Sequence, residues 1–312
     1  WVPVRGWGRL FPFLYAARLT RVLRRNQFDW LHLRVTPYGQ IIRALEKTSV
    51  PISVEHIEDH LPNAALRKIG HRFSLGFTNS EKNARLLREQ LGIRRDRIGP
   101  LPDGVDPGVM SRPVDRAGVR SKFGLDSEAF GVVHASSFRW HHDFDTILEA
   151  VRRLRFPIQI AFCGGGPRTG EIRKKADALR VNTRFLGPLP QALLSEVLAA
   201  SDACVDALVR TVPINGNLRP SKLWEYMASG TPTVETVDAA SELPSWAGDC
   251  LGLVPPEDSQ ALAEALTHIR YNPSLWADKA ARARAWVLAN KTWEAVTAQA
   301  VAAMERVVRG QS

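Results

Sequence analysis

The sequence predicts an α/β protein with two doubly wound, Rossmann-like domains that face a cleft. Short strand-like segments alternate with amphipathic helix-like segments along the chain. The strand-like segments are continuous apolar runs, which is typical of parallel sheets covered by helices on both faces. The chain has 312 residues, enough for two domains of about 100–200 residues each. Ligands in such folds bind beyond the carboxyl ends of the strands.

The first half is predicted to contain helices and strands in alternation. Ser80 is a good N-cap for one helix, and Glu81 lies in its first turn. The segment 100–113 is rich in Pro and Gly and indicates an interdomain linker. In order, we expect a helix at 10–25, a strand at 30–35, a helix at 41–45, strands at 51–56 and 75–78, a helix at 80–90 and a strand at 98–101.

The second half repeats this alternation. Gly230 is predicted to end one of its helices as a C-cap. Strands are expected at 130–135, 158–163, 183–186, 203–207, 233–235 and 251–254. Helices are expected at 145–154, after the glycines at 164–166 as far as Arg180, and at 191–200, 221–229, 259–271, 274–289 and 292–309.

Composition excludes several classes of protein. Apolar residues make up 45% and charged residues 24%, a globular mixture rather than a disordered chain or a coiled coil. No apolar run approaches the ~18 residues of a transmembrane helix, and no secretory signal is predicted. The three scattered cysteines, Cys163, Cys204 and Cys250, are typical of a reduced, cytoplasmic protein without a disulfide framework.

The net charge of +10 lies entirely in the first part of the chain. Residues 1–127 contain 22 Lys and Arg against 12 Asp and Glu, whereas residues 128–312 contain 20 of each. The segment 1–28 has six Arg, no acidic residue and several aromatic residues, a pattern that suits the surface of an anionic membrane. A solvated helix face explains the charge equally well. Nucleic acid is not expected as a partner, because no nucleic-acid-binding motif accompanies the charge.

The segment 219–230, RPSKLWEYMASG, carries the strongest chemical signal. Lys222 and Glu225 are three residues apart and share one face of the predicted helix. The loop 213–217 before it can present backbone N–H groups, and such a loop leading into a helix N-terminus is an anion site. Lys222 supplies a charge for a phosphate, and the Glu225 carboxylate can accept hydrogen bonds from ribose hydroxyls. A core helix with a surface Lys–Glu pair is the alternative, and the spacing leaves both open.

This segment resembles the donor-binding motif P-x-K-L-x-E-Y-M-A-x-G of GT-B glycosyltransferases of family GT4. Further segments resemble landmarks of that family in the same order, from about Asp29 to Met304. Any one of them is weak, but their order is hard to explain otherwise. They are 77–81 (FTNSE), 101–106 (LPDGVD), 162–167 (FCGGGP) and 185–187 (FLG).

The resemblance implies roles for particular residues. The catalytic positions would be His56, Arg139 and Lys222, with His56 facing the donor sugar and Arg139 beside the phosphates. His142 stands where the family has a Lys, and Asn217 stands where it has a first Glu, eight positions before Glu225. A His is a weaker phosphate ligand and is titratable near neutrality. The donor-binding positions would be Ser137, His142, Gly164, Gly187, Asn215, Gly216, Asn217, Ser221 and Glu225.

The residues leave an alternative without a functional role open for two of these positions. For Arg139 the alternative is a solvated loop cation. For His56 it is a histidine satisfied by neighbouring backbone.

Three other patterns are weaker. Asp143 and Asp145 spell D-x-D but open a predicted helix, where an aspartate caps and complements the dipole. The run 141–143, HHD, has no distant partner for a zinc site. The glycines at 164–166 lack the spacing of a dinucleotide-binding motif.

The resemblance implies a retaining, metal-independent enzyme of the hexosyltransferase type. It would use a UDP-sugar as co-substrate, need no further cofactor, and act on a glycan or lipid-linked acceptor of the cell envelope at the inner face of the membrane. We expect a partial acceptor-side domain at 1–107, a linker at 108–127, a donor domain at 128–290, and at 291–312 a helix that returns to the first domain. The chain begins with Trp1, and roughly the first 80–100 residues of the family pattern are expected to be missing. A nucleotide-sugar-binding subunit without turnover is the main alternative, and a basic nucleic-acid-binding protein is a third.

Overall fold

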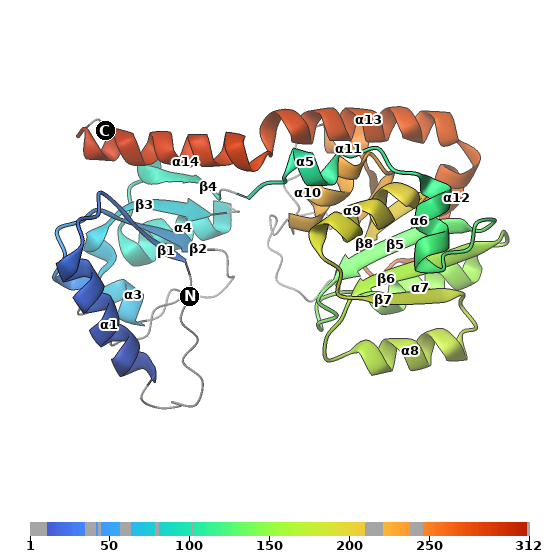
Figure 1. The fold of residues 1–312 in the computed structure, drawn as a ribbon, viewed down its shortest axis with the longest axis horizontal. Helices are drawn as coiled ribbons and strands as arrows, with labels where there is room; N and C mark the ends of the chain where they lie inside the picture. The colour runs from blue at the N-terminus through green and yellow to red at the C-terminus, as the bar shows by residue number, and fades with distance from the viewer. Residues whose placement is uncertain are drawn as a thin grey trace. The chain divides into compact units, whose positions relative to one another are not determined.

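The computed structural model describes residues 11–34, 42, 45–56, 64–78, 81–101, 103–209, 221–237 and 246–310. The chain divides into two compact units. Unit 1 is Trp1–Pro102 together with Thr297–Ser312, and unit 2 is Asp103–Val296. Each unit contains a parallel sheet with helices packed on it, so the predicted α/β fold is confirmed (Figure 1).

The sheet of unit 1 has the strands in chain order. They are β1 (Leu31–Arg34), β2 (Ile52–His56), β3 (Phe73–Thr78) and β4 (Ile98–Pro100), and all neighbours pair in parallel. One face packs on α1 (Phe11–Arg25), α3 (Ala64–Lys68) and α4 (Glu81–Leu91) through a core that includes Ile52, Val54 and Leu87. The other face packs over β3 on α14 (Trp293–Val308), where Leu75 and Phe77 meet Ala300. Short 3-10 helices, η2 (Gly70–Arg72) and η3 (Arg95–Arg97), connect these elements.

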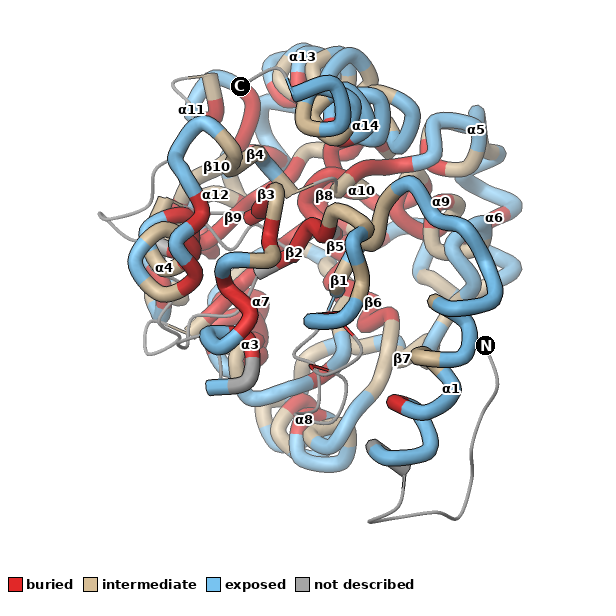
Figure 2. The backbone as a smooth tube through the Cα atoms, turned by 90° about the vertical axis from the view of Figure 1, so that its left-hand side faces the viewer, coloured by how far each residue is buried: buried red, intermediate tan, exposed pale blue. Residues whose placement is uncertain are grey.

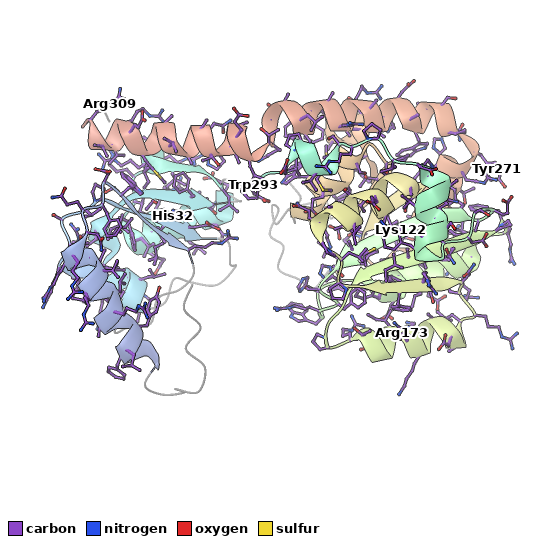
Figure 3. The ribbon with its side chains drawn as sticks, viewed as in Figure 1. His32, Lys122, Arg173, Tyr271, Trp293 and Arg309 are labelled. Carbon is purple, nitrogen blue, oxygen red and sulfur yellow. The ribbon has the colours of Figure 1, made fainter. Side chains whose placement is uncertain are left out.

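Over β1 and β2, the face that carries Phe77 is polar. His32 projects from β1 (Figure 3), with its Nδ1 2.9 Å from Ser53 Oγ and its Nε2 3.2 Å from Glu55 Oε2. The indole of Trp30 donates to the same Ser53 oxygen at 2.8 Å. Arg34 lies 3.3 Å from the other oxygen of Glu55. The buried Glu55 carboxylate is therefore held between two basic side chains of the edge strand.

Unit 2 contains a fully parallel sheet in the order β10-β9-β8-β5-β6-β7. From β5 the chain moves outward through β6 and β7, and then returns to the other side of β5 with β8. The order therefore reverses between β5 and β8. The strands are β5 (Phe130–Ser136), β6 (Ile158–Gly164), β7 (Thr183–Gly187), β8 (Ala203–Asp206), β9 (Thr233–Thr236) and β10 (Gly252–Val254).

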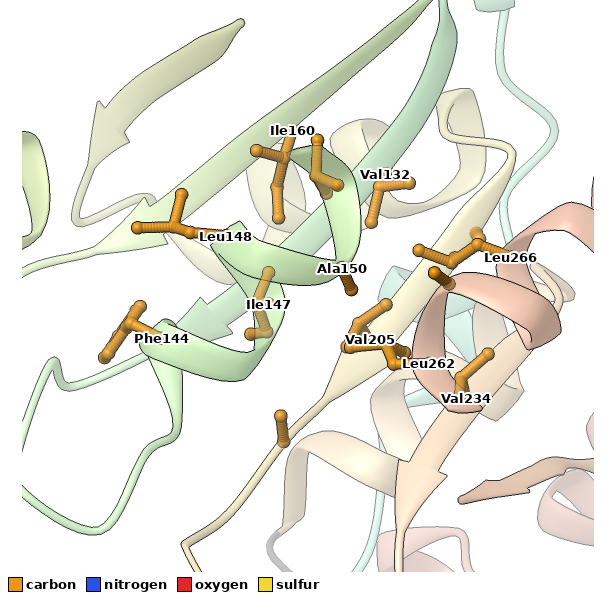
Figure 4. Close-up of a cluster of buried hydrophobic side chains, with 14 of the residues drawn as sticks. Val132, Phe144, Ile147, Leu148, Ala150, Ile160, Val205, Val234, Leu262 and Leu266 are labelled. Carbon is orange, nitrogen blue, oxygen red and sulfur yellow. The ribbon is translucent and has the colours of Figure 1, made fainter. Parts of the chain in front are cut away.

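Helices cover both faces of this sheet. Successive residues of its strands point to opposite faces, and the residues on both faces are apolar. On one face, Val132, Val205 and Val234 pack against α7 (Phe144–Arg153) and α12 (Ser259–Tyr271) (Figure 4). On the other face, Val133 and Cys204 pack against α9 (Gln191–Ala200), α10 (Ser221–Ser229) and α13 (Pro273–Asn290). Strands β5 and β8 are accordingly buried, while the side of α13 that points away from the sheet is exposed (Figure 2). The remaining helices are α8 (Thr169–Ala178) and α11 (Ala247–Cys250).

The segment that we predicted as a linker, 108–127, contains helical structure and lies within unit 2. It includes most of α5 (Pro107–Met110) and all of α6 (Arg116–Phe123). The side chain of Arg120 is buried and joins α6 to the sheet, with its Nη2 2.6 Å from Asp202 Oδ2. The Pro- and Gly-rich composition therefore marks short helices and their caps, here those supplied by Asp106 and Asp115.

Most other predicted elements of unit 2 are confirmed within one or two residues. Helices α9, α10 and α12 have the predicted bounds, and Gly230 has the positive φ of 75° that a C-cap of this kind requires. The predicted N-cap Ser80 lies outside the described residues. No described helix is long and apolar enough to cross a membrane.

Candidate functional site

The reversal of strand order between β5 and β8 creates the place where a ligand site is expected in a doubly wound sheet. Here the loops that follow the two strands are joined by backbone hydrogen bonds. Asp143 N donates to Ala207 O at 2.9 Å, and Val209 N donates to His141 O at 3.1 Å. His142 also forms an antiparallel bridge with Leu208. The loop that follows β5 (residues 137–143, the β5 loop) is therefore held in one position beside the end of β8.

Glycines let the loop after β6 approach the β5 loop closely. Gly164 has φ +119°, and a Cβ atom there would lie 1.9 Å from Ser136 O. A Cβ atom on Gly166 would lie 2.3 Å from Ser137 O. Phe138, which directly follows Ser137, has φ 37° and a fully buried ring. The glycines at 164–166 thus allow the two loops to contact each other, because any side chain at Gly164 or Gly166 would clash.

Helix α10 brings its first two turns to the same place. Its apolar side chains, among them Leu223 and Met227, are fully buried against the sheet. The hydroxyl oxygen of Tyr226 accepts a hydrogen bond from Ala135 N at 2.7 Å, which ties the helix to the end of β5. Lys222 and Glu225 are then left on the side of α10 that faces the loops.

A cavity of about 490 Å³ lies between these segments, within the range of small-molecule sites. It gathers predicted donor residues from separate parts of the chain. Ser137 and His142 come from the β5 loop, Gly164 from the end of β6, and Lys222 and Glu225 from α10. The lining is completed by Ala135, Ser136, His141, Cys163, Pro188, Leu189 and Leu194.

Lys222 does not form a surface pair with Glu225, so that alternative interpretation of α10 is wrong. Its side chain is nine-tenths buried, and its Nζ lies 2.6 Å from Asp206 Oδ1 at the end of β8. The same Nζ lies 3.1 Å from Nδ1 of His142. The Asp206 side chain is completely buried. A buried ion pair with a neighbouring imidazole therefore forms one wall of the cavity.

The expectation that His142 is titratable near neutrality is wrong. Burial lowers the pKa of His142 far below the ordinary value, and the positive charge of Lys222 lowers it further. Burial also lowers the pKa of the neighbouring His134 to about 3, again with help from Lys222. Both rings are neutral at physiological pH. At His142 the site thus offers a neutral ring in place of the cation that the family has there.

Glu225 is the acceptor group of the cavity. Burial raises the pKa of the Glu225 carboxyl, and the charge of Asp103 raises it further, while a hydrogen bond from Gln191 lowers it. That bond joins Gln191 Nε2 to Glu225 Oε1 at 3.2 Å. A carboxylate that is partly desolvated in this way binds hydroxyl donors more strongly than one in water.

The other predicted site residues are not brought to the cavity by the described geometry. Arg139 belongs to the β5 loop, but its side chain is exposed and does not line the cavity. Gly187 has φ +71° and directly precedes the lining residue Pro188. Ser221 begins α10, and nothing is described of its side chain. Asn215, Gly216 and Asn217 lie outside the described residues. His56 ends β2 in unit 1, with only its backbone described.

The D-x-D segment has the capping role that we predicted. Asp143 Oδ1 accepts from Thr146 N at 2.9 Å and caps α7. Asp145 lies 2.6 Å from Lys175. Among the residues that the structure describes, no cluster of three or more His, Cys, Asp or Glu side chains has the arrangement of a metal site. Cys163 lines the cavity, but burial raises the pKa of its thiol to about 12, so it is no nucleophile at neutral pH.

Asp206 and His134 contact lining residues of this site, and sequence reasoning missed both. Asp206 is the last residue of an apolar strand, and the rule about carboxyl ends could have identified it. His134 lies inside β5, with Nδ1 2.8 Å from Val205 O and Nε2 2.9 Å from Ser136 Oγ. No pattern in the sequence indicates that a histidine within an apolar strand reaches the site.

Comparison with known proteins identifies the class. Residues 129–272 match the family described as glycosyl transferases group 1. A comparison with curated protein sequences gives no match. A glycosyltransferase from Rickettsia africae has a similar structure, with a TM-score of 0.79 at 13% identity over 98% of this chain and 84% of that one.

Two further solved structures are similar. Anabaena Alr3699/HepE, in complex with UDP, has a TM-score of 0.77 at 16% identity over 93% of this chain and 81% of that one. A sucrose-phosphate synthase from Thermosynechococcus elongatus has a TM-score of 0.75 at 18% identity over 100% and 81%. Residues 129–272 therefore match a glycosyltransferase group 1 domain, and the chain has the GT-B fold of these glycosyltransferases.

Proposed function

We propose that this enzyme transfers a sugar from a UDP-sugar to a glycan or lipid-linked acceptor, with retention of configuration and without a metal. One observation carries the proposal. A single cavity in unit 2 is lined by five residues that the donor motif of the family predicts, from three separate segments. These are Ser137, His142, Gly164, Lys222 and Glu225.

In this cavity Glu225 would accept hydrogen bonds from the ribose hydroxyls. An ionised carboxylate only accepts, and a ribose offers two adjacent donors. The apolar wall formed by Leu189 and Leu194 is suited to the face of a base. Uracil is the base that we propose, because Anabaena Alr3699/HepE is described in complex with UDP and with UDP-glucose.

The diphosphate would lie between the β5 loop and the first turn of α10. The first N–H groups of a helix have no partner within the helix, and its N-terminus has a partial positive charge; α10 has nine residues. Lys222 and His142 are the side-chain donors on either side. Because Asp206 pairs with Lys222, we expect the exposed Arg139 to supply much of the charge that stabilises the leaving diphosphate.

Thermal unfolding with UDP, GDP and ADP in parallel tests the donor site. A ligand at 100 times its dissociation constant should stabilise the fold by about 2.7 kcal/mol. We expect a shift with UDP that is lost in Lys222→Ala and Glu225→Ala. The matched controls are Lys174→Ala and Glu264→Ala, which remove exposed residues of the same types from α8 and α12. A shift with none of the nucleotides would contradict the proposal.

Turnover separates the enzyme from a binding subunit. Incubation with a UDP-sugar and a panel of glycan and lipid-linked acceptors should release UDP, and NMR of the product should give the anomeric configuration of the donor. Activity that survives a metal chelator would support the metal-independent mechanism. Nucleotide binding without turnover over the whole panel would favour the alternative of a nucleotide-sugar-binding subunit.

We also propose that unit 1 carries the acceptor side and that α1 contacts an anionic membrane at its cytoplasmic face. Phe13 is 58% exposed and Tyr15 47% exposed, and the same helix exposes several arginines, Arg18, Arg21, Arg24 and Arg25. Exposed aromatic and basic residues on one helix are typical of interfacial binding. Flotation with vesicles of anionic lipid should capture the chain, and Phe13→Ser with Tyr15→Ser should release it. Equal capture by vesicles of neutral lipid would argue against an electrostatic contact.

A further inference from the structure

We propose that Asp206 is a positioning residue of the donor site, which acts through Lys222 to orient His142 as a hydrogen-bond donor toward the diphosphate. The inference rests on the proposed function, because it assigns a step of recognition to the same cavity. It concerns a residue that is completely buried and does not line the cavity. Asp206 ends β8, so it lies at the reversal of strand order where the loops of the site begin.

The direction of each hydrogen bond follows from chemistry. An ammonium group has three N–H donors and no acceptor. Lys222 Nζ lies 2.6 Å from Asp206 Oδ1 as an ion pair, and it directs one N–H toward His142 Nδ1 at 3.1 Å. Since Nζ can only donate, Nδ1 of His142 must accept and carries no proton. We infer that another N–H of Lys222 serves a ligand in the cavity that Lys222 lines.

The surroundings of His142 keep the ring neutral. Burial is the main cause that lowers the pKa of His142. The basic groups around the ring, Lys222, His134, His141 and Arg168, lower it further. Its ring lies 5.7 Å from that of His134 and 4.2 Å from that of His141. A neutral imidazole carries one proton. With Nδ1 occupied as an acceptor, that proton is on Nε2.

The backbone fixes where this donor lies. His142 pairs with Leu208 across the two loops, and its carbonyl accepts from Arg168 Nη1 at 3.2 Å. Among the described contacts of His142, Nε2 has no hydrogen-bond partner, and the side chain lines the cavity. A phosphate oxygen is an acceptor that matches a single N–H of this kind.

The carboxylate of Asp206 is what keeps Lys222 in this position. A charged amine in a nine-tenths buried site is strongly disfavoured unless it is paired. Without the carboxylate, Lys222 would turn toward solvent or hold Nδ1 less firmly, and His142 could exchange to the other tautomer. Asp206 therefore sets a hydrogen-bond direction in the site, in addition to balancing a charge.

The test uses the full chain with the Asp206→Asn variant, which keeps the size of the side chain. The ¹⁵N NMR signals of the His142 ring, assigned by their loss in His142→Gln, report the tautomer directly. We expect the Nε2–H form in the parent chain and a mixture of tautomers in Asp206→Asn. The affinity for UDP should fall about tenfold, which corresponds to about 1.4 kcal/mol.

A matched control separates positioning from a structural role. Asp202 precedes the same strand at its other end and pairs with Arg116 and Arg120, remote from the lining of the cavity. Asp202→Asn should lower the unfolding temperature and leave the His142 signals and the UDP affinity unchanged. If Asp206→Asn does not fold, the double variant Asp206→Leu with Lys222→Met removes both charges and should recover the fold while the Nε2–H form is lost.

Two results would overturn the inference. One is an unchanged His142 tautomer in Asp206→Asn or in the double variant. The other is a changed tautomer with unchanged UDP affinity, which would make Asp206 structural only. A parent chain that shows the Nε2–H form but binds neither UDP, GDP nor ADP would instead contradict the proposed function, so the two failures are distinguishable.

Discussion

The phenol oxygen of Tyr226 lies 2.7 Å from the backbone nitrogen of Ala135 and accepts its hydrogen bond. Tyr226 is fully buried on α10, and Ala135 is near the end of β5, so this contact joins the two elements that carry the cavity. The helix that holds Lys222 and Glu225 is thereby fixed relative to the loop that holds His142.

Tyr226→Phe should therefore destabilise unit 2 by about 1–3 kcal/mol, because it leaves a buried N–H without an acceptor. Urea unfolding measures the change. Tyr271→Phe is the matched control, since Tyr271 is 67% exposed on α12, and it should change stability by less than about 0.5 kcal/mol. Equal effects of the two variants would show that the contact with Ala135 carries no stability.

Gly164→Ala should damage the site more than an ordinary glycine substitution. The conformation at φ +119° costs about 1–3 kcal/mol for a residue with a side chain, and the new Cβ would clash with Ser136 O. The β5 loop would have to move, so we expect weaker UDP binding as well as lower stability. Gly170→Ala in α8 is the control, because nothing lies within 4 Å of its Cβ, and it should keep both properties. Parent-like UDP affinity in Gly164→Ala would show that the loop contact is dispensable.

Arg120→Met should destabilise unit 2 by about 3–5 kcal/mol, the cost of breaking a buried ion pair from one side. The guanidinium pairs with Asp202 and also donates to backbone carbonyls, including Ala200 O at 3.0 Å and Ala129 O at 3.1 Å. The comparison is Arg152→Met on α7, which removes an exposed pair with Glu149 and should cost about 0.5 kcal/mol or less. Chemical denaturation of both variants decides this. A loss at Arg120 no larger than that at Arg152 would mean that α6 is held by apolar packing alone.

His134 should make the protein less stable in acid. Burial lowers its pKa from 6.5 to about 3 in the folded chain. Between these values the unfolded chain binds a proton that the folded chain does not. The free energy of unfolding should therefore fall as the pH drops from about 6.5 toward 3, by up to about 1.4 kcal/mol per pH unit from this residue. His142, whose pKa is lowered by burial and by Lys222, contributes in the same direction.

The variant His134→Asn removes this contribution. Urea unfolding at pH 7.5, 6.5, 5.5 and 4.5 should show a constant loss of stability above pH 6.5, from the lost hydrogen bonds to Val205 and Ser136. Below pH 6.5 the gap between variant and parent should narrow. Parallel curves over the whole range would contradict a depressed pKa at His134.

Local patterns in the sequence predicted the helices and strands of unit 2 closely, because each has its own apolar period and some of the helices have recognisable end residues. The Ser221–Ser229 helix with Gly230 is an example. Residues 108–127 show the limit of such patterns. The Pro and Gly content of the overlapping segment 100–113 indicated a linker here, but α6 is stabilised by Arg120 at contacts 80 residues away in the sequence. Helical packing of this kind depends on distant partners that no local pattern contains.

The cavity residues Ser137, His142, Gly164, Lys222 and Glu225 could be named from motifs, since motifs record residue types at a fixed spacing. The contacts and protonation states of those residues could not be assigned from motifs. The spacing of Lys222 and Glu225 allowed a surface pair, whereas the fold pairs Lys222 with Asp206. The type of His142 suggested a titratable cation, whereas burial makes it neutral.

The sequence by itself thus determined the positions of most strands and helices of unit 2, the kind of domain that residues 129–272 form and five of the residues around the cavity. Only the tertiary structure decided the partner of Lys222 and the protonation of His142. The physical reason is that desolvation and ion pairing depend on which groups the fold brings within a few ångströms. Asp206 and Lys222 are sixteen positions apart in the chain, and they meet because α10 packs against the strands beside the end of β8.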